Sequence, residues 1–333
     1  MDLLLHFLHS PFLGKAAWVW LLFVGIVALL LAFDLGVLHK DDREIEVKDS
    51  LLLSSGYIGV ALLFGAWVWW FMGAQSGTEY FTGFLIEKSL SMDNVFVIAM
   101  IFAALGIPRR YQHRVLFWGV LGVIVLRALM IGLGALLVAQ LSWVLYLFGA
   151  FLIVTGIRMW RTVGHEPNME GSVLLRFLRR HLRITPALHG NAFFVHQADP
   201  ATGRTLRWAT PLFLALCMVE LIDLVFAVDS VPAIFAITSD PFIVYTSNIF
   251  AILGLRALYF ALAAMVHRFT YLKYALALVL VFIGGKIMLV GIIGKVPAVI
   301  SLGVTFDLIA GGVALSLWKT RGQRGQQRRL ENA

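Results

Sequence analysis

Apolar stretches of about 20 residues recur from one end of this chain to the other, separated by short polar segments. About 20 helical residues span the hydrocarbon core of a bilayer, and in that core every backbone polar group must be bonded within the structure. Hydrophobic residues make up 60% of the 333 residues and charged residues only 14%, with a mean hydropathy of +0.86. The chain therefore predicts an all-α, polytopic membrane protein.

Windows of this length predict about nine transmembrane helices. They cover residues 17–38, 50–72, 80–103, 114–137, 142–160, 209–237, 241–265, 273–293 and 296–318. Lysine and arginine fall mostly in alternate connections, and an excess of these residues is typical of the cytoplasmic side. We therefore expect the N-terminus outside and the C-terminus in the cytoplasm.

Two of these spans carry acidic residues at membrane depth, where an Asp or Glu costs about 2.5 to 3.5 kcal/mol. Residues 87–94 read Glu-Lys-Ser-Leu-Ser-Met-Asp-Asn, and residues 220–232 read Glu-Leu-Ile-Asp-Leu-Val-Phe-Ala-Val-Asp-Ser-Val-Pro. Ionisable residues at this depth face the bundle interior and mark ion or proton pathways. The candidate site residues are Glu87, Asp93, Asn94, Glu220, Asp223, Asp229 and Ser230.

The two acidic spans open an internal repeat. Laying Asp93 over Asp229 also brings Asn94 onto Ser230 and Glu87 onto Asp223. The following spans share the sequence Leu-Arg-Ala-Leu, at residues 126–129 and 255–258. Each unit is three helices long, and an odd number of crossings turns the second copy upside down. Inverted repeats of this kind are a recurrent transporter plan, with the substrate site near the midplane between the copies.

The repeats divide the chain into five parts. These are a two-helix segment at 1–75, the first repeat at 80–160, a cytoplasmic amphipathic loop at 161–208, the second repeat at 209–294, and a last helix with a basic tail at 295–333. The loop combines a basic amphipathic stretch at 173–184 with a hairpin signal around residues 193–203. We expect this loop to lie on the inner membrane surface.

Straight helices cannot point all of the acidic residues at one place, because each residue advances about 100° around the axis. Glu220 and Asp223 share a face of one helix, and Asn94 shares the face of Glu87. Pro232 lacks an amide hydrogen and strains the preceding turn. We therefore predict a discontinuous helix near Asp229, as in many transporters.

Carboxylate, amide, hydroxyl and free carbonyl oxygens are hard ligands that suit magnesium, calcium or manganese. The residues thus predict a divalent cation as the guest. Arg127 and Arg256 occupy matching positions in the repeats and serve either as gates or counter-ions, or as simple bridges in a structural bundle. Five acidic residues against two arginines leave an excess of negative charge that protons or a metal would have to neutralise.

These motifs, together with residues 246–258 (Thr-Ser-Asn-Ile-Phe-Ala-Ile-Leu-Gly-Leu-Arg-Ala-Leu), resemble the TerC family, in particular its Alx-type members. The resemblance runs from Asp34 to the last span. It implies manganese efflux across the bacterial inner membrane, and the acids that would form the metal path here are Glu87, Asp93, Glu220, Asp223 and Asp229. The choice of manganese comes from the resemblance, since ligand chemistry alone leaves magnesium and calcium open.

Outward movement of a divalent ion against an inside-negative potential costs about 4.6 kcal/mol per 100 mV. The sequence contains no G-x-x-x-x-G-K-[ST] stretch for direct use of ATP, so we expect exchange for protons. A passive channel is the other mechanism that the residues leave open.

We expect no tightly bound cofactor and no nucleic-acid partner, because the basic residues that produce the net charge of +8 mostly lie between the spans. An intramembrane hydrolase is a weaker alternative, since no histidine lies in the acidic spans, and we do not expect an enzyme. A second alternative is an accessory protein that supplies metal to exported metalloproteins at the translocon. The residues leave the oligomeric state open, and they do not separate metal supply from bulk efflux.

Overall fold

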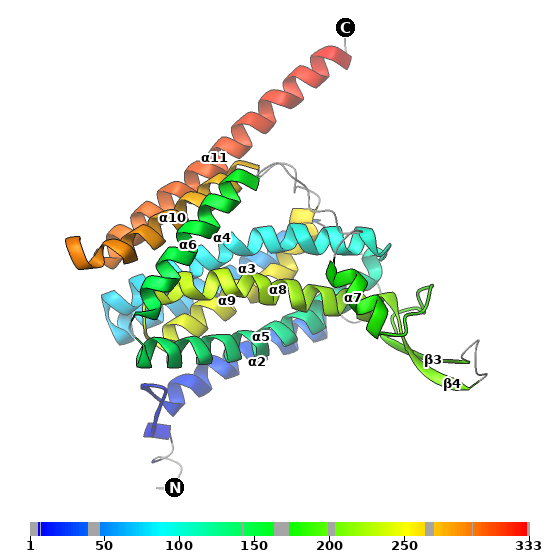
Figure 1. The fold of residues 1–333 in the computed structure, drawn as a ribbon, viewed down its shortest axis with the longest axis horizontal. Helices are drawn as coiled ribbons and strands as arrows, with labels where there is room; N and C mark the ends of the chain where they lie inside the picture. The colour runs from blue at the N-terminus through cyan, green and yellow to red at the C-terminus, as the bar shows by residue number, and fades with distance from the viewer. Residues whose placement is uncertain are drawn as a thin grey trace.

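The computed structural model describes residue 6 and residues 8–38, 47–141, 143–162, 173–198, 204–263, 270–294 and 296–331. Within these ranges the side chains of Asp93, Asp229 and Arg256, among others, lie outside the described part. The chain forms a bundle of long helices with two small hairpins (Figure 1).

The elements follow in chain order. They are β1 (Pro11–Phe12), β2 (Lys15–Ala16), α2 (Ala17–Leu38), α3 (Val47–Met72), α4 (Ala74–Ala104), α5 (Arg109–Gln140), α6 (Val144–Thr162), α7 (Val173–His181), β3 (Phe194–Ala198), β4 (Thr205–Ala209), α8 (Pro211–Phe235), α9 (Pro241–Ala263), α10 (Thr270–Ile293) and α11 (Ala298–Glu331).

Each predicted span coincides with one long helix of the described chain. The first helix begins and ends where the hydropathy window does, at Ala17 and Leu38, whereas α11 continues beyond the predicted 318 to Glu331. Among the described residues, six helices, α3, α5, α6, α8, α10 and α11, contain segments that are long and apolar enough to cross a membrane. The architecture is thus that of a polytopic helical membrane protein, while nine crossings stay a prediction.

Helices of the two predicted repeats pack reciprocally. The first helix of one unit packs on the second helix of the other, α4 on α9 and α8 on α5, and the third helices α6 and α10 pack together. The helices α4 and α8 run in opposite directions, because Asn94 contacts Asp223 while Glu87 and Ser230 share the same partner further along. This is the arrangement that an inverted repeat would give; the repeat itself stays a prediction.

An aromatic cluster holds the N-terminal helices against the second unit. Phe23 of α2, Phe64 of α3 and Phe250 of α9 lie with ring centroids 4.8 to 6.1 Å apart, all buried. Buried aromatic pairs of this kind add to the free energy gained from apolar burial. The N-terminal helices therefore pack against one face of α9, and the opposite face of α9 carries polar residues.

The predicted break near Asp229 is wrong. Both acidic helices are continuous, α4 through residues 87–94 and α8 through Pro232 to its end at Phe235. The proline lies in the last turn of α8, where a missing amide hydrogen disturbs only a short remaining helix. Ser89 donates to the carbonyl of Leu85 at 2.7 Å, a bond made within an intact helix.

The predicted amphipathic stretch and hairpin in the loop after α6 are present as α7 and the antiparallel pair β3–β4. They lie together at one end of the bundle (Figure 1). Arg207 of β4 lies 3.8 Å from the ring centroid of Phe194 on β3, a cation–π contact. Their position on a membrane surface stays a prediction.

Small residues allow α6 and α10 to approach closely. A Cβ atom on Gly284 of α10 would lie 2.5 Å from the carbonyl oxygen of Gly149, and one on Gly156 of α6 would lie 2.7 Å from that of Ala277. Glycine at such contacts is the common device for packing membrane helices, because it lets the backbones meet. The backbones of α6 and α10, the third helices of the two predicted units, are therefore in direct contact.

Replacing Gly284 by alanine is expected to destabilise the protein by about 1 to 3 kcal/mol, because the added methyl group must separate two backbones. The matched control is the next residue, Gly285, whose added Cβ would meet nothing within 4 Å. Thermal unfolding in detergent should show a lower midpoint for Gly284→Ala and an unchanged or higher one for Gly285→Ala. Equal midpoints would contradict the close contact.

Candidate cation site between the two acidic helices

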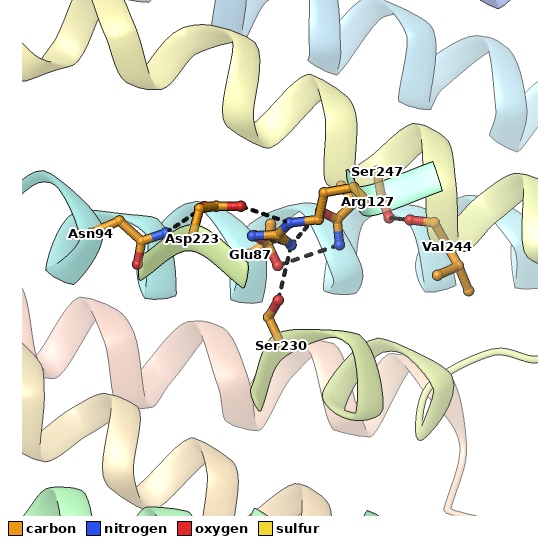
Figure 2. Close-up of polar contacts among 8 residues, drawn as sticks. Glu87, Asn94, Arg127, Asp223, Ser230, Val244 and Ser247 are labelled. Atoms are coloured by element: carbon orange, nitrogen blue, oxygen red, sulfur yellow. Dashed lines mark hydrogen bonds and ion pairs between the residues drawn. The ribbon is translucent and has the colours of Figure 1, made fainter. Parts of the chain in front are cut away.

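Arg127 of α5 lies at the centre of a polar cluster formed with α4, α8 and α9 (Figure 2). Its Nη1 lies 2.7 Å from Glu87 Oε1, and it donates to Ser230 Oγ at 2.9 Å and to Asn248 Oδ1 at 2.6 Å. Its Nε donates to Asp223 Oδ2 at 3.4 Å. The side chains of Arg127 and Glu87 are each 1% exposed, so this charge cluster is held away from solvent.

The cluster contains both residue pairs that the predicted repeat would match. Asn94 donates to Asp223 Oδ1 at 3.2 Å, whereas Glu87 and Ser230 both contact Arg127 Nη1, at 2.7 and 2.9 Å. The repeat would pair Glu87 with Asp223 and Asn94 with Ser230, so α4 and α8 each contribute one member of each pair. Continuous helices bring these four residues together because α4 and α8 are antiparallel, and each contributes residues seven positions apart.

Asn248 of α9 is a site residue that the sequence reasoning missed. It accepts a hydrogen bond from Arg127 and donates one to Glu87 Oε2 at 3.4 Å. The preceding Thr246 and Ser247 bond carbonyls of their own helix, as Figure 2 shows for Ser247 and Val244. A buried amide in an apolar span is itself costly unless it is bonded. An asparagine in the middle of an apolar span was therefore the sequence feature that could have identified Asn248 as a site residue.

Glu220 is set apart from this cluster. Its carboxylate lies against Gly122 of α5, where an added Cβ atom would overlap it. Its Oε2 is buried and has no hydrogen-bond partner among the described residues. The same is true of Asn94 Oδ1 and of Arg127 Nη2. Buried polar atoms without partners are uncommon, and each of these three is a place where an incoming group could supply the partner.

Three predicted residues, Asp93, Asp229 and Arg256, lie with their side chains outside the described part of the structure. Within the described part, no three His, Cys, Asp or Glu side chains form a group that could hold a metal ion. Of the predicted ligands, Glu87, Asn94, Asp223 and Ser230 are brought together, and three of them bond Arg127. The charge pairing weighed as a structural alternative is thus present at Arg127.

Two cavities lead toward the cluster from the end of the bundle where α4 ends. The larger, about 340 Å³, is lined by Gln112 and Tyr259 among others. Tyr259 also lines a second cavity of about 50 Å³, whose wall includes Asn94 and Asp223. The Tyr259 hydroxyl donates to Gln112 Oε1 at 3.1 Å. This hydrogen-bonded pair therefore lines the larger cavity, and its tyrosine also lines the smaller one.

Two further cavities continue the series. One of about 20 Å³ is lined by Glu87, Arg127 and Ser230 among others. At the opposite end of the bundle, a cavity of about 1200 Å³ is lined by residues that include Glu79, Asp240 and Lys286. The cluster therefore lies between separate small cavities on the side of one end of the bundle and a wide cavity at the other end.

Replacing Glu87 by glutamine is expected to lower the free energy of unfolding by about 3 kcal/mol, because buried Arg127 loses its closest counter-charge. The matched control is Glu79→Gln on the same helix, where the carboxylate is half-buried and accepts from Gln75 at 3.0 Å. Unfolding titrations of both variants in the same detergent measure the difference. A change of the same size in both would contradict a special role for the buried pair.

Comparison with known proteins finds relatives along most of the chain. Residues 72–324 match the model of the family described as "Integral membrane protein TerC family". An "Uncharacterized membrane protein" of Rickettsia bellii is 49% identical over 298 residues, which cover 90% of this chain and 96% of that protein. A membrane protein of Myxococcus xanthus is 47% identical over 303 residues, which cover 91% of this chain and 93% of that protein.

One named relative comes from Escherichia coli K12. It is 44% identical over 309 residues, which cover 90% of this chain and 94% of that protein, and it is called "Putative membrane-bound redox modulator Alx". No solved structure matches the chain.

Proposed function

The chain belongs to the TerC family of integral membrane proteins, and on this premise we propose that it exports a divalent metal cation, manganese above all, in exchange for protons. The proposed location is the bacterial inner membrane, with the N-terminus outside and the C-terminus in the cytoplasm. In this proposal the protein is a transporter rather than an enzyme.

The convergence of oxygen ligands on a buried cation supports this function most directly. Carboxylates from α4 and α8 and an amide from α9 surround the Arg127 guanidinium. These are the hard ligands that magnesium, calcium and manganese prefer. Glu220 lies apart from the guanidinium, against Gly122, and adds a third described carboxylate to the two that share Arg127, so carboxylates outnumber this guanidinium. Asp93 and Asp229 would strengthen that excess.

The cavities suggest the direction of the path. The route past Tyr259 would begin at the predicted cytoplasmic end, and the wide vestibule beside Glu79 would face outside. In an alternating-access cycle, the cation binds from the first route and leaves through the second after the two units rock. Protons from outside then neutralise carboxylates and lower their affinity for the metal, which offsets the cost of outward transport.

The name of the Escherichia coli relative raises a redox role. The sequence contains a single cysteine, Cys217, so thiol–disulfide exchange between two cysteines of one chain cannot occur. Export or supply of a redox-active metal would connect the two descriptions. Supply of metal to exported metalloproteins at the translocon is a variant of the proposed function that uses the same site.

Vesicle transport tests the proposal. Inside-out vesicles containing the purified protein should accumulate Mn²⁺ when an imposed proton gradient is present, and Asp93→Asn and Asp229→Asn should abolish accumulation. The control is Asp49→Asn, since this exposed residue at the start of α3 lies outside the cluster. Parallel assays with Ca²⁺ and Mg²⁺ measure selectivity. Accumulation of none of these ions by folded protein would contradict export.

A glycine substitution tests the place of Glu220. In Gly122→Ala the added methyl group must displace the Glu220 carboxylate, so we expect a transport rate at least tenfold lower with little loss of stability. The matched control is Gly132→Ala on the same helix, because its added Cβ would meet nothing within 4 Å. Equal transport rates in the two variants would show that the Glu220 carboxylate takes no part.

A further inference from the structure

Arg127 holds the groups that a transported cation would need. It bonds Glu87, Asp223 and Ser230, three predicted ligands that come from both acidic helices. A guanidinium keeps its positive charge in proteins and only donates hydrogen bonds. The oxygens that accept these bonds are also the oxygens that would ligate a metal, and a guanidinium repels a divalent cation placed beside it. Arg127 and a divalent cation therefore compete for these oxygens.

We propose that Arg127 is a tethered competitor of the transported cation, which must leave Glu87 and Asp223 before the metal can bind both carboxylates and which returns when the metal departs. This inference rests on the proposed function and names how the same site is regulated. A simple structural bridge would instead keep its contacts whether or not a metal is bound.

The space around the cluster supports competition. The cavity beside Glu87 and Arg127 has about 20 Å³, enough for one water molecule, whereas the cavity beside Asn94 and Asp223 has about 50 Å³. A cation arriving from the Tyr259 side can therefore reach the Asp223 end first. The cation cannot bind Glu87 as well until the Arg127 side chain moves away, because that side chain fills the space beside Glu87.

The side-chain oxygen of Asn94 lacks a hydrogen-bond partner among the described residues, and we infer that an arriving cation contacts it first. Asn94 is 5% exposed, and its Oδ1 has no hydrogen-bond partner among the described residues, while its Nδ2 is bonded to Asp223. Asn94 also lines both small cavities. An approaching cation would give this oxygen the partner that it lacks, next to the carboxylate that Arg127 holds by its longer contact of 3.4 Å.

Competition also explains how release can follow tight binding. When the metal leaves, the returning guanidinium neutralises two buried carboxylates, which would otherwise repel each other in a low-dielectric interior. Its return lowers the apparent affinity for metal by the free energy of the Arg127 contacts. The unloaded protein can then reorient with its site already neutralised.

Metal binding to Arg127→Met tests the inference. Purified wild type and variant in lipid nanodiscs are titrated with Mn²⁺, and the free ion is followed by its paramagnetic resonance signal. Without the competitor, the variant should bind Mn²⁺ at least tenfold more tightly, about 1.4 kcal/mol. Proton-driven accumulation in vesicles should fall at the same time, since the tightly held metal is not released.

The matched control is Lys88→Met, which removes another buried positive charge from the neighbouring position on α4. Lys88 is 8% exposed and donates to the carbonyl of Ala251 at 3.2 Å. A general effect of removing positive charge would raise Mn²⁺ affinity equally in both variants and would overturn the proposal. Competition at the site predicts a much larger gain for Arg127→Met.

Arg127→Met leaves buried carboxylates unpaired, so its folding is measured with and without Mn²⁺. Added Mn²⁺ should raise the unfolding midpoint of the variant more than that of wild type. If the variant does not fold in either condition, Arg127→Lys provides the test. A lysine lacks the planar guanidinium that contacts two carboxylates at once, so it should compete less with the metal. The Arg127→Lys protein should therefore bind Mn²⁺ more tightly than wild type.

Two kinds of failure are distinguishable. If wild type binds and transports Mn²⁺ but the folded Arg127 variants bind Mn²⁺ no more tightly than wild type does, then Arg127 is not a competitor of the metal. The proposed export function would be unaffected by that result. If neither wild type nor variants bind any of Mn²⁺, Ca²⁺ and Mg²⁺, then export itself is contradicted, and the competitor with it.

Discussion

Buried negative charge without enough positive charge is the constraint on which this structure depends. Moving a carboxylate out of water costs several kcal/mol unless a cation and hydrogen bonds compensate it. Glu87 and Asp223 meet that requirement by sharing Arg127, with Asn94, Ser230 and Asn248 completing the hydrogen bonds. The antiparallel course of α4 and α8 and the packing of α5 and α9 against them all serve to assemble this cluster.

The same constraint gives the cluster its chemistry. In the proposed function, the position that holds a guanidinium between oxygen ligands would also hold a metal cation, and a change in helix packing would shift the balance between the two. Arg127 comes from α5, whereas the carboxylates come from α4 and α8. A small rocking of one predicted three-helix unit against the other would therefore change the distance between the guanidinium and Asp223, which lies on α8 of the second unit. Membership of the TerC family and the antiparallel packing of the two acidic helices fit such a cycle.

Hydropathy and charge predicted the helices well, because a membrane span needs a continuous apolar stretch that few other segments imitate. The internal match of Glu87 with Asp223 likewise pointed to residues that share a partner. The sequence reasoning failed where packing decides. Pro232 suggested a broken helix, yet it lies in the last turn of α8, where a missing amide hydrogen disturbs little. Asn248 and Gly122 were missed because their roles depend on the neighbouring helix, which no periodicity within α9 or α5 reveals.

Anomalous diffraction at the manganese edge, from crystals grown with Mn²⁺, tests the central claim most directly. The account predicts a peak between α4 and α8 that is bonded to carboxylate oxygens of Glu87 or Asp223, with the Arg127 guanidinium displaced from them. A peak confined to the surface, or one elsewhere in the bundle with Arg127 still bonded to both carboxylates, would contradict it.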